Sequence, residues 1–387
     1  MNAQSRRLRI AVLNRVFSPT GGGAERYSIA LVEQLAQRHE IHVFAQRIEH
    51  RWPGVTYHRV SSPMTKPRWI NQLWFASATW WATRRGFDVV HSHENTWHGN
   101  VQTVHVVPVR YKLFQGRSGW RLWLRWLKVF SSPRLLVYLG LERLRFSVGD
   151  GRRIVLASSS LVAQMATSYP AAVPALQVLT PGVAKVMGAA SFSERLAARA
   201  RLGLPATGHG ILFVANDYRK KGLDALLRAL AQWPGDSWLA VVGDAAQIPE
   251  YSARARTVGV ADRVAFLGPL KEIADAYLAV DCLAHPTLED TFAMVVLEAL
   301  AHGLPVLVSA EPYCGISALL EHERNALILE EPTDAAALAR GLDRLFQDLA
   351  LGQALSAAAL TFAARHLWSE IAEQQQAIYD SVQDCPG

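Results

Sequence analysis

The chain has 387 residues, 50% of them hydrophobic and 19% charged, and this length favours two domains over one ordinary core. The formal net charge of +7 is unevenly distributed: residues 1–185 carry 25 Lys/Arg against 8 Asp/Glu, and residues 186–387 carry 15 against 25. The basic half favours a polyanionic partner: an anionic membrane surface, nucleic acid or a phosphorylated glycan. The acidic half argues against a protein that coats nucleic acid along its whole length, so we expect no nucleic-acid partner.

The cysteine content and the hydropathy of the chain indicate the cellular compartment. The three cysteines, Cys282, Cys314 and Cys385, form no C-x-x-C pair, so we expect neither a disulfide framework nor a zinc site. No apolar segment approaches the roughly 20 residues that a bilayer-spanning helix needs, and the N-terminal apolar run is too short for a signal peptide. These features predict a protein that is soluble or peripheral, on the cytoplasmic side of a membrane.

Strands alternate with helices along both halves of the chain. Apolar runs predict strands at residues 8–17, 40–46, 54–60, 87–93 and 153–159, and later at 209–217, 237–244, 263–268, 282–286 and 304–310. Helical spacing predicts helices over 27–39 and 220–233, and a linker with a helix spans 180–208. We therefore expect an α/β fold with two facing Rossmann-like doubly wound parallel-sheet domains and a cleft between them.

The predicted domains are residues 1–185, joined by a C-terminal helix over 366–387, and residues 186–365. In open parallel sheets, ligands bind at the carboxyl ends of the strands, where loops and helix N-termini collect. The loops after the strands are therefore the candidate sites.

The stretch LEDTFAMVVLEALAHGLPVLVSA places Asp290 and Glu298 eight residues apart around an apolar run. We expect a helix from Thr291 onward, so Asp290 lies at a helix entry, where free N–H groups and the helix dipole favour a phosphate. From the residues alone, a structural interpretation is the more ordinary one. Asp290 would then cap the helix, and Glu298 would be solvated or hydrogen-bonded.

Two further loops carry candidate residues. Lys220 and Lys221 precede Gly222 at a predicted helix start, where two cations could neutralise a pyrophosphate, although a solvated basic turn is the more common fate of such a pair. The loop SPTGGGAER contains Gly22 and Gly23, and its glycines permit positive φ and close approach of a ligand. It lacks G-x-G-x-x-G, which disfavours a nicotinamide oxidoreductase.

Histidines offer weaker signals. His105 ends the apolar stretch NVQTVHVVP, and a single histidine is more often a satisfied, partly buried residue than a catalytic one. The segment HSHEN at 91–95 lacks a third ligand at a fitting spacing, and no D-x-D occurs, so we expect no metal and no bound cofactor. Cationic side chains and helix dipoles are expected to stabilise an anionic ligand instead.

The segment from Arg110 to Phe146 contains nine Lys/Arg and one acid. Within it, cations at i, i+4 and i+7 interleave with tryptophans, which favours an interfacial amphipathic helix on an anionic membrane or an acceptor surface. The residues concerned are Trp120, Arg121, Trp123, Arg125, Trp126 and Lys128. An ordinary helix with a solvated basic face is almost equally compatible with this pattern.

The acidic pair, the following ALAHGLPVLVS, the GG-x-E-R loop and the Lys-Gly at a helix start resemble glycosyltransferase family 4, whose members have the GT-B architecture. Within the family, DYRKKGLDALLRALAQWP, YCGISALL and RYKLFQGRSGW resemble bacterial lipopolysaccharide core glucosyltransferases that act on heptose. The family pattern is E-x7-E, whereas this chain has Asp290 at the first position, which leaves the donor sugar open. Many members also carry an Arg where this chain has Asn216.

The resemblance implies that residues 1–185 bind the acceptor and residues 186–365 the nucleotide sugar, and it implies roles for particular residues. Glu298 would bind the donor ribose, Asp290 the transferred sugar and Lys221 the diphosphate, and His105 would line the reaction centre. The catalytic residues implied are His105, Asp290 and Lys221. The donor-binding residues implied are Gly22, Gly23, Asn216, Lys220, Lys221, Glu289, Thr291, Phe292, Ala293, Met294 and Glu298.

By the same resemblance we expect a retaining, metal-independent hexosyltransferase that moves glucose from UDP-glucose to a lipopolysaccharide core or a similar glycolipid acceptor. The alternative is a family 4 transferase that uses UDP-N-acetylglucosamine or GDP-mannose in capsule, O-antigen or exopolysaccharide synthesis. A catalytically silent binding protein on the same fold is the rival from another functional class.

Overall fold

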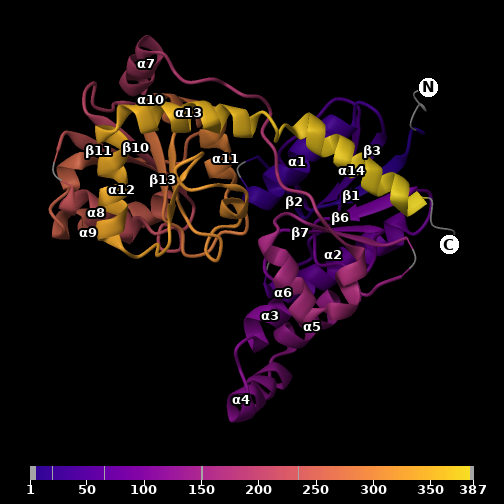
Figure 1. The fold of residues 1–387 in the computed structure, drawn as a ribbon. Helices are drawn as coiled ribbons and strands as arrows, with labels where there is room; N and C mark the ends of the chain where they lie inside the picture. The colour runs from indigo at the N-terminus through magenta and orange to yellow at the C-terminus, as the bar shows by residue number, and fades with distance from the viewer. Residues whose placement is uncertain (1–5, 20, 65, 150, 234, 384–387) are drawn as a thin grey trace. The chain divides into compact units, whose positions relative to one another are not determined.

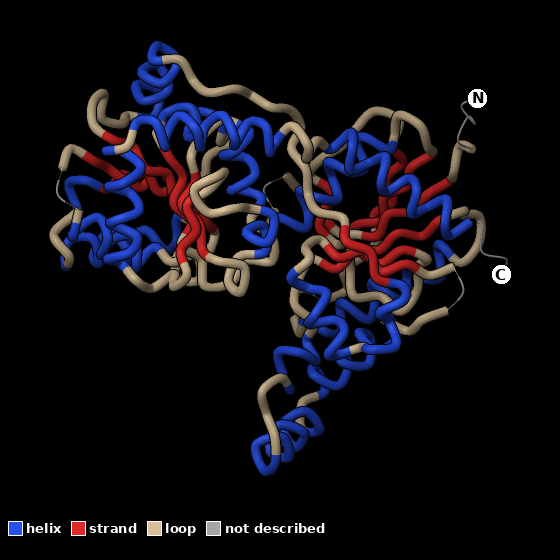
Figure 2. Tube along the Cα trace, viewed as in Figure 1, coloured by secondary structure: helices blue, strands red, loops and turns tan. Residues whose placement is uncertain are grey.

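The computed structural model describes residues 6–19, 21–64, 66–149, 151–233 and 235–383; Cys385 therefore lies outside the described residues. The chain divides into two compact units: unit 1 runs to Pro181 and includes the chain from Trp368 onward, and unit 2 is Gly182–Leu367. These divisions lie within a few residues of the predicted ones. In each unit, strands form a sheet with helices packed around it (Figure 2).

Unit 1 contains a seven-stranded parallel sheet in the order β5-β3-β1-β6-β7-β8-β9. Its strands are β1 (Arg9–Leu13), β3 (Glu40–Ala45), β5 (Val55–Arg59), β6 (Val89–Ser92), β7 (Val101–Val104), β8 (Arg153–Leu156) and β9 (Leu176–Val178). The short strands β2 (Val16–Phe17) and β4 (Arg47–Ile48) pair separately. Because β1 is central and buried on both faces, its residues from Ile10 to Leu13 are all apolar.

The helices of unit 1 are α1 (Gly23–Leu35), α2 (Arg68–Thr83), α3 (Val109–Phe114), α4 (Gly119–Phe130), α5 (Pro133–Arg145), α6 (Ser160–Ser168) and α14 (Trp368–Gln383). Helix α14 lies along α1, as Figure 1 shows, and Trp368 packs edge-on against Tyr27 at 5.2 Å between ring centroids. Tyr379 of α14 also hydrogen-bonds His91 of β6 at 2.7 Å. The last helix therefore completes the core of unit 1.

Unit 2 contains a six-stranded parallel sheet in the order β12-β11-β10-β13-β14-β15. Its strands are β10 (His209–Ala215), β11 (Ser237–Gly243), β12 (Val264–Gly268), β13 (Cys282–His285), β14 (Val306–Ser309) and β15 (Leu327–Leu329). Its helices are α7 (Phe192–Leu202), α8 (Leu223–Gln232), α9 (Ile248–Thr257), α10 (Ala274–Ala279), α11 (Met294–Ala301), α12 (Ala335–Gln347) and α13 (Leu349–Ala363). The strands β10, β13 and β14 are neighbours, so the loops that follow them meet at one edge.

Two parallel-sheet α/β units confirm the predicted fold class, but several boundaries were wrong. The strand predicted over 8–17 is broken after Leu13, because Asn14 turns inward and donates a side-chain hydrogen bond to Ser28. Helix α1 starts four residues before the predicted 27–39 helix, and α8 starts three residues after the predicted 220–233 one. The short strands β7, β9 and β15 were not predicted from the sequence.

Among the described residues, no helix is both long and apolar enough to cross a bilayer. Helix α4 lies away from the unit 1 sheet, at the end of an extension formed with α3 and α5 (Figure 1). Of its twelve residues only Val129 is buried. Its outward position makes it the most exposed apolar helix of unit 1.

Candidate active site

Three loops of unit 2 meet at the carboxyl edge of its sheet. They follow β10, β13 and β14, and backbone hydrogen bonds tie them together. The amide of Leu288 donates to the carbonyl oxygen of Lys220 at 2.8 Å, and the amide of Asp290 donates to that of Tyr313 at 2.7 Å. These hydrogen bonds fix the three loops relative to one another, and the predicted donor residues of unit 2 lie on them.

Gly222 allows the first two loops to approach. Its φ is +81°, and a Cβ there would lie 1.9 Å from the carbonyl oxygen of Pro286. Only glycine is compatible with both the left-handed conformation and this contact. Lys220 and Lys221 are thereby held beside the loop that carries Asp290.

Asp290 is the most highly connected side chain at this edge. Its Oδ2 accepts a hydrogen bond from Lys221 Nζ at 2.6 Å and lies 3.2 Å from His285 Nε2. Its Oδ1 accepts from the backbone amides of Ala293 at 2.9 Å and Phe292 at 3.3 Å. Burial acts to raise the pKa of Asp290, but the hydrogen bonds and charges of His285 and Lys221 outweigh it and hold the pKa well below its usual range.

The helix predicted from Thr291 begins instead at Met294. The short Asp290 side chain folds back on its own backbone and holds residues 290–293 in a turn. The amides of Phe292 and Ala293, which the resemblance assigns to the donor, thus bind Asp290 in this structure. Phe292 is 4% exposed, so its side chain belongs to the core.

Ala293 has φ +70°, an unusual value for a residue with a Cβ. Such a conformation costs roughly 1–3 kcal/mol and persists only where neighbours impose it. Here the Asp290 carboxylate holds the Ala293 amide, and the amide of Ile316 donates to the carbonyl oxygen of Phe292 at 3.0 Å. The strained residue immediately precedes the free N-terminal amides of α11, where an anion is favoured.

Lys221 also donates to the backbone oxygen of Glu289 at 2.8 Å. A lysine has three N–H donors, and the described residues engage two of them, so one remains for an anionic ligand. Lys220, Asn216 and Glu289 are exposed at the same edge. The structure thus brings most predicted donor residues of unit 2 together.

Glu298 lies in the second turn of α11 and is partly buried. Tyr277 of α10 donates its hydroxyl to Glu298 Oε2 at 2.8 Å, and the ring of His302 stacks on Tyr277 at 4.9 Å. The carboxylate therefore has a fixed orientation. Tyr277 could not be identified from the sequence, because an aromatic residue on an amphipathic helix carries no distinguishing signal.

His285 was also missed. It occupies the last position of β13, 1% of its side chain is exposed, and its Nδ1 has no hydrogen-bond partner among the described residues. Because a carboxylate only accepts hydrogen bonds, Nε2 carries the proton that faces Asp290. A histidine in the otherwise apolar strand CLAH is the signal that could have identified it.

In unit 1, His105 follows β7 at the carboxyl edge of its sheet. Its Nε2 lies 2.9 Å from His93 Nδ1, the two rings stack, and Tyr27 packs edge-on at 5.0 Å. Burial and the charge of Arg145 lower the pKa of His105 to about 3, so its ring is neutral at neutral pH. With His93 Nδ1–H as the donor to His105 Nε2, the neutral His105 ring carries its proton on Nδ1.

The glycine loop differs from expectation. Gly22 precedes α1 with φ −75°, so it does not use the positive φ that we predicted. Gly21 is required for a different reason: a Cβ there would lie 2.8 Å from the Cβ of Glu25. Gly23 is the first residue of α1, so the α1 N-terminus and His105 lie at the same sheet edge.

The described residues contain no group of three His, Cys, Asp or Glu side chains placed to hold a metal ion. The described residues form a pocket of about 470 Å³ in unit 1 and another of about 670 Å³ in unit 2. Both lie at the amino ends of their strands, and neither is lined by a predicted donor residue.

Comparison with known proteins relates both units to one enzyme class. Residues 21–184 match a model described as "Glycosyltransferase Family 4", and residues 208–348 match "Glycosyl transferases group 1". A D-inositol 3-phosphate glycosyltransferase of Xylanimonas cellulosilytica is 32% identical over 59% of this chain and 58% of that protein. The lipopolysaccharide glucosyltransferase WaaG of Escherichia coli is 26% identical over 50% of this chain and 53% of that protein. The chain thus spans about half the length of the curated relatives it matches.

Solved structures extend the likeness to the whole fold. The crystal structure of WaaG, a glycosyltransferase involved in lipopolysaccharide biosynthesis, superposes with a TM-score of 0.81 at 22% identity, over 96% of this chain and 99% of that chain. HepE of Anabaena in complex with UDP-glucose gives 0.73 at 19% identity, over 96% and 98%. At these identities the likeness establishes a shared GT-B fold.

Proposed function

The chain belongs to the glycosyltransferases, with a family 4 domain in its first half and a group 1 domain in its second. From this premise we propose that it transfers a hexose, glucose from UDP-glucose, to a lipopolysaccharide core or a similar surface-glycan acceptor. The proposed reaction retains the anomeric configuration and uses no metal. The relatives' names support glucose and lipopolysaccharide, because WaaG is a lipopolysaccharide glucosyltransferase.

The observation that carries this proposal is the fixed pair of carboxylates at the carboxyl edge of unit 2. Asp290 is held by Lys221 and His285, and Glu298 is held by Tyr277. We assign Glu298 to the ribose hydroxyls, because an oriented carboxylate accepts two hydrogen bonds from a diol. Asp290 is assigned to hydroxyls of the transferred sugar.

The diphosphate needs positive charge, and the chain offers it without a metal. Lys221 has one N–H left, Lys220 is exposed beside it, and the first amides of α11 lie next to Ala293. These groups would stabilise the charge that develops on the leaving diphosphate. In a front-side displacement the acceptor oxygen bonds to the anomeric carbon as the bond to the diphosphate breaks. The leaving diphosphate oxygen takes the acceptor proton.

For unit 1 we propose that His105 presents its neutral Nδ1–H to the transferred sugar. The low pKa of His105 supports hydrogen-bond donation rather than proton transfer as its role. Gly22 and Gly23, at the start of α1, are assigned to the donor diphosphate and the acceptor. No strong general base is required in this scheme.

A panel of nucleotide sugars tests the donor. A ligand that binds only the folded state stabilises it by about 2.7 kcal/mol at a hundredfold excess over Kd. We expect UDP and UDP-glucose to raise Tm, UDP-glucose to support transfer, and GDP-mannose to have little effect. A matching response to UDP-N-acetylglucosamine or GDP-mannose would select the alternative donor, and the absence of any nucleotide effect would leave only a binding protein.

The acceptor is tested with the same assay. Lipopolysaccharide core is the expected substrate, and D-inositol 3-phosphate is the second candidate because several relatives carry that name. Transfer to inositol phosphate in preference to core oligosaccharide would reassign the acceptor while leaving the donor site intact.

We further propose that α4 is the membrane-binding element. Trp120 and Trp123 are 68% and 64% exposed, and Phe130 is 67% exposed. Such a group of exposed aromatic side chains is uncommon on a soluble protein and marks an interaction surface. Arg121 and Lys128 are exposed along the same helix, so its apolar side chains can enter the acyl boundary while its cations meet lipid phosphates. Trp126, in contrast, packs within the protein, because its ring stacks on that of Phe114 with 4.6 Å between the ring centroids.

Changing Arg121, Arg125 and Lys128 to Glu should sharply weaken sedimentation with anionic vesicles, because each cation near such a surface contributes about 1 kcal/mol. Transfer to a soluble core oligosaccharide should be unchanged. The matched control reverses three basic residues outside α4: Arg68, Arg85 and Arg365. Equal losses in the two triple variants would show that net charge alone drives binding.

A further inference from the structure

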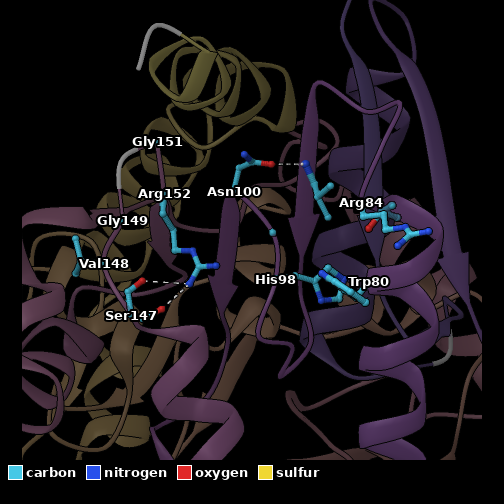
Figure 3. Close-up of a pocket in the computed structure, with 12 residues that line it drawn as sticks. Trp80, Arg84, His98, Asn100, Ser147, Val148, Gly149, Gly151 and Arg152 are labelled. Atoms are coloured by element: carbon cyan, nitrogen blue, oxygen red, sulfur yellow. Dashed lines mark hydrogen bonds between the residues drawn. The ribbon is translucent and has the colours of Figure 1, made fainter. Parts of the chain in front are cut away.

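The pocket of about 470 Å³ in unit 1 is separate from the residues assigned to transfer. It lies at the amino ends of β6, β7 and β8, whereas His105 lies at the carboxyl end of β7. Its walls come from the last turn of α2, the turn before β7 and the loop between α5 and β8 (Figure 3). The lining residues are Trp80, Thr83, Arg84, Val90, His98, Gly99, Asn100, Ser147, Val148, Gly149, Gly151 and Arg152.

Arg152 supplies positive charge to the pocket without a carboxylate partner among the described residues. Its Nη1 donates to the carbonyl oxygens of Leu144 at 3.0 Å and Ser147 at 3.1 Å, and its Nη2 donates to that of Trp97 at 3.1 Å. These neutral acceptors fix the guanidinium, and no carboxylate of the described residues is paired with it. Burial accordingly lowers the pKa of Arg152. Asp150 lies outside the described residues.

Arg84 supplies a second cation. It is exposed at the end of α2, and its guanidinium lies 3.6 Å from the ring centroid of Trp81 and 5.9 Å from that of Trp80. The two indoles hold the guanidinium without neutralising it. None of the twelve lining residues is acidic, so the pocket favours an anion.

His98 adds an unsatisfied polar group. Both of its ring nitrogens are buried and have no hydrogen-bond partner among the described residues. Burial and the charge of Arg152 lower the pKa of His98 to about 4, so at neutral pH the ring offers one N–H donor and one acceptor. A buried polar group without a partner costs about 1–3 kcal/mol, and a ligand in the pocket would recover part of that cost.

Exposed apolar side chains lie near Arg84 and Arg152. Trp80 and Val148 line the pocket and are 42% and 49% exposed. Trp81 and Leu144, which neighbour the lining residues in sequence, are 64% and 52% exposed. A cationic pocket with exposed apolar side chains beside it can bind a molecule that is anionic at one end and apolar at the other.

We propose that this pocket binds the phosphate-bearing headgroup of an anionic glycerophospholipid. Arg84, Arg152 and the N–H of His98 would contact the phosphate, and Trp80 and Val148 would contact the first carbons of the acyl chains. The volume suits a glycerophosphate, because 470 Å³ holds on the order of fifteen waters at about 30 Å³ each and so exceeds what a bare phosphate fills. This inference does not depend on the transfer reaction, since no transfer residue lines the pocket.

Glycerol 1-phosphate is the soluble probe, and its binding to the full chain can be followed by calorimetry. Arg84→Gln is expected to weaken this binding by about tenfold, as loss of a charge-assisted contact does. Arg85→Gln is the matched control, because Arg85 is the exposed adjacent cation and does not line the pocket. Equal losses in the two variants would overturn the proposal.

His98→Phe separates ligand binding from folding. Removal of two unpartnered ring nitrogens should leave Tm unchanged or raise it, while binding of glycerol 1-phosphate falls at least severalfold. Undiminished binding in a folded His98→Phe protein would exclude this pocket as the site.

Vesicles identify the source of the phosphate. Glycerol 1-phosphate should bind more tightly than inorganic phosphate, and it should reduce binding to vesicles of phosphatidylcholine with phosphatidylglycerol. The α4 charge-reversal variant should bind glycerol 1-phosphate normally, which distinguishes failure of this proposal from failure of the α4 proposal. If inorganic phosphate bound equally well and neither phosphate competed with vesicles, the assignment to a lipid would be wrong.

Discussion

Asp290→Asn is expected to lower kcat/KM by about 100- to 1,000-fold, as loss of an oriented charge in a transfer site does. The amide keeps an oxygen for the backbone of Phe292 and Ala293, so the turn should persist. It loses the charge that holds Lys221 and His285, whose contacts to Asp290 are 2.6 and 3.2 Å. Steady-state kinetics with UDP-glucose give the measurement.

The same variant should change how stability depends on pH. The pKa of Asp290 is depressed in the folded state, so its stabilising contribution is present above the unfolded value of about 3.9 and is lost as pH falls through the folded pKa. Denaturant unfolding should show that the wild type loses this contribution below about pH 4. The Asn variant lacks it at every pH.

Asp275→Asn is the matched control. Asp275 also has a lowered pKa, caused chiefly by its hydrogen bond from Arg201, but that ion pair is largely exposed. An exposed pair contributes at most about 1 kcal/mol, and neither residue lies at the carboxyl edge. If Asp275→Asn reduced transfer as much as Asp290→Asn, or if both variants had wild-type kinetics, the role assigned to Asp290 would be wrong.

Glu298→Ala is expected to raise the donor KM at least tenfold, to abolish most activity and to remove the Tm increase caused by UDP. A hydrogen bond to a charged group contributes about 1.5–3 kcal/mol, and a carboxylate on a ribose diol makes two. Donor titrations by kinetics and by thermal shift would both report the loss. Wild-type affinity for UDP in this variant would falsify the assignment.

Tyr277→Phe gives a graded companion to that variant. It removes the hydroxyl that donates to Glu298 Oε2 at 2.8 Å, together with its longer 3.4 Å hydrogen bond to the carbonyl oxygen of Val295. A smaller rise in donor KM is expected, of about fivefold for roughly 1 kcal/mol, with kcat nearly unchanged. A fall in kcat without a change in KM would contradict a role in orienting the ribose ligand.

The fold, and the meeting of the candidate residues of unit 2 at the carboxyl edge of its sheet, could be predicted from the sequence. Apolar strands such as 209–217 and 237–244 repeat with helices between them, and parallel strands collect their following loops at one edge. This rule was sufficient to predict that Lys221 and Asp290 lie close together. The two residues are 69 positions apart in the chain, and Lys221 Nζ lies 2.6 Å from Asp290 Oδ2. This prediction depended on the residue types and on the order of the strands along the chain.

The local geometry could not be predicted. The start of α11 at Met294 was not predicted, because a side chain that caps a helix and one that closes a turn before it bind the same backbone amides, here those of Phe292 and Ala293. Tyr277 acts through a hydrogen bond to a residue 21 positions further along the chain, and a single sequence does not record such a contact. His285 lies only five positions before Asp290, and its place in an apolar strand was the available signal. Short strands such as β15 lack enough residues for a periodic pattern.

Helix α14 has a consequence for how the protein is made. Unit 1 buries Trp368 and Tyr379 against Tyr27 and His91, yet the ribosome produces these residues only after all of unit 2. Until then the α1 face that receives α14 is uncovered, so unit 2 can finish folding before the first-synthesised unit does. Nascent chains therefore spend the interval of unit 2 synthesis with an apolar surface open to chaperones or to self-association.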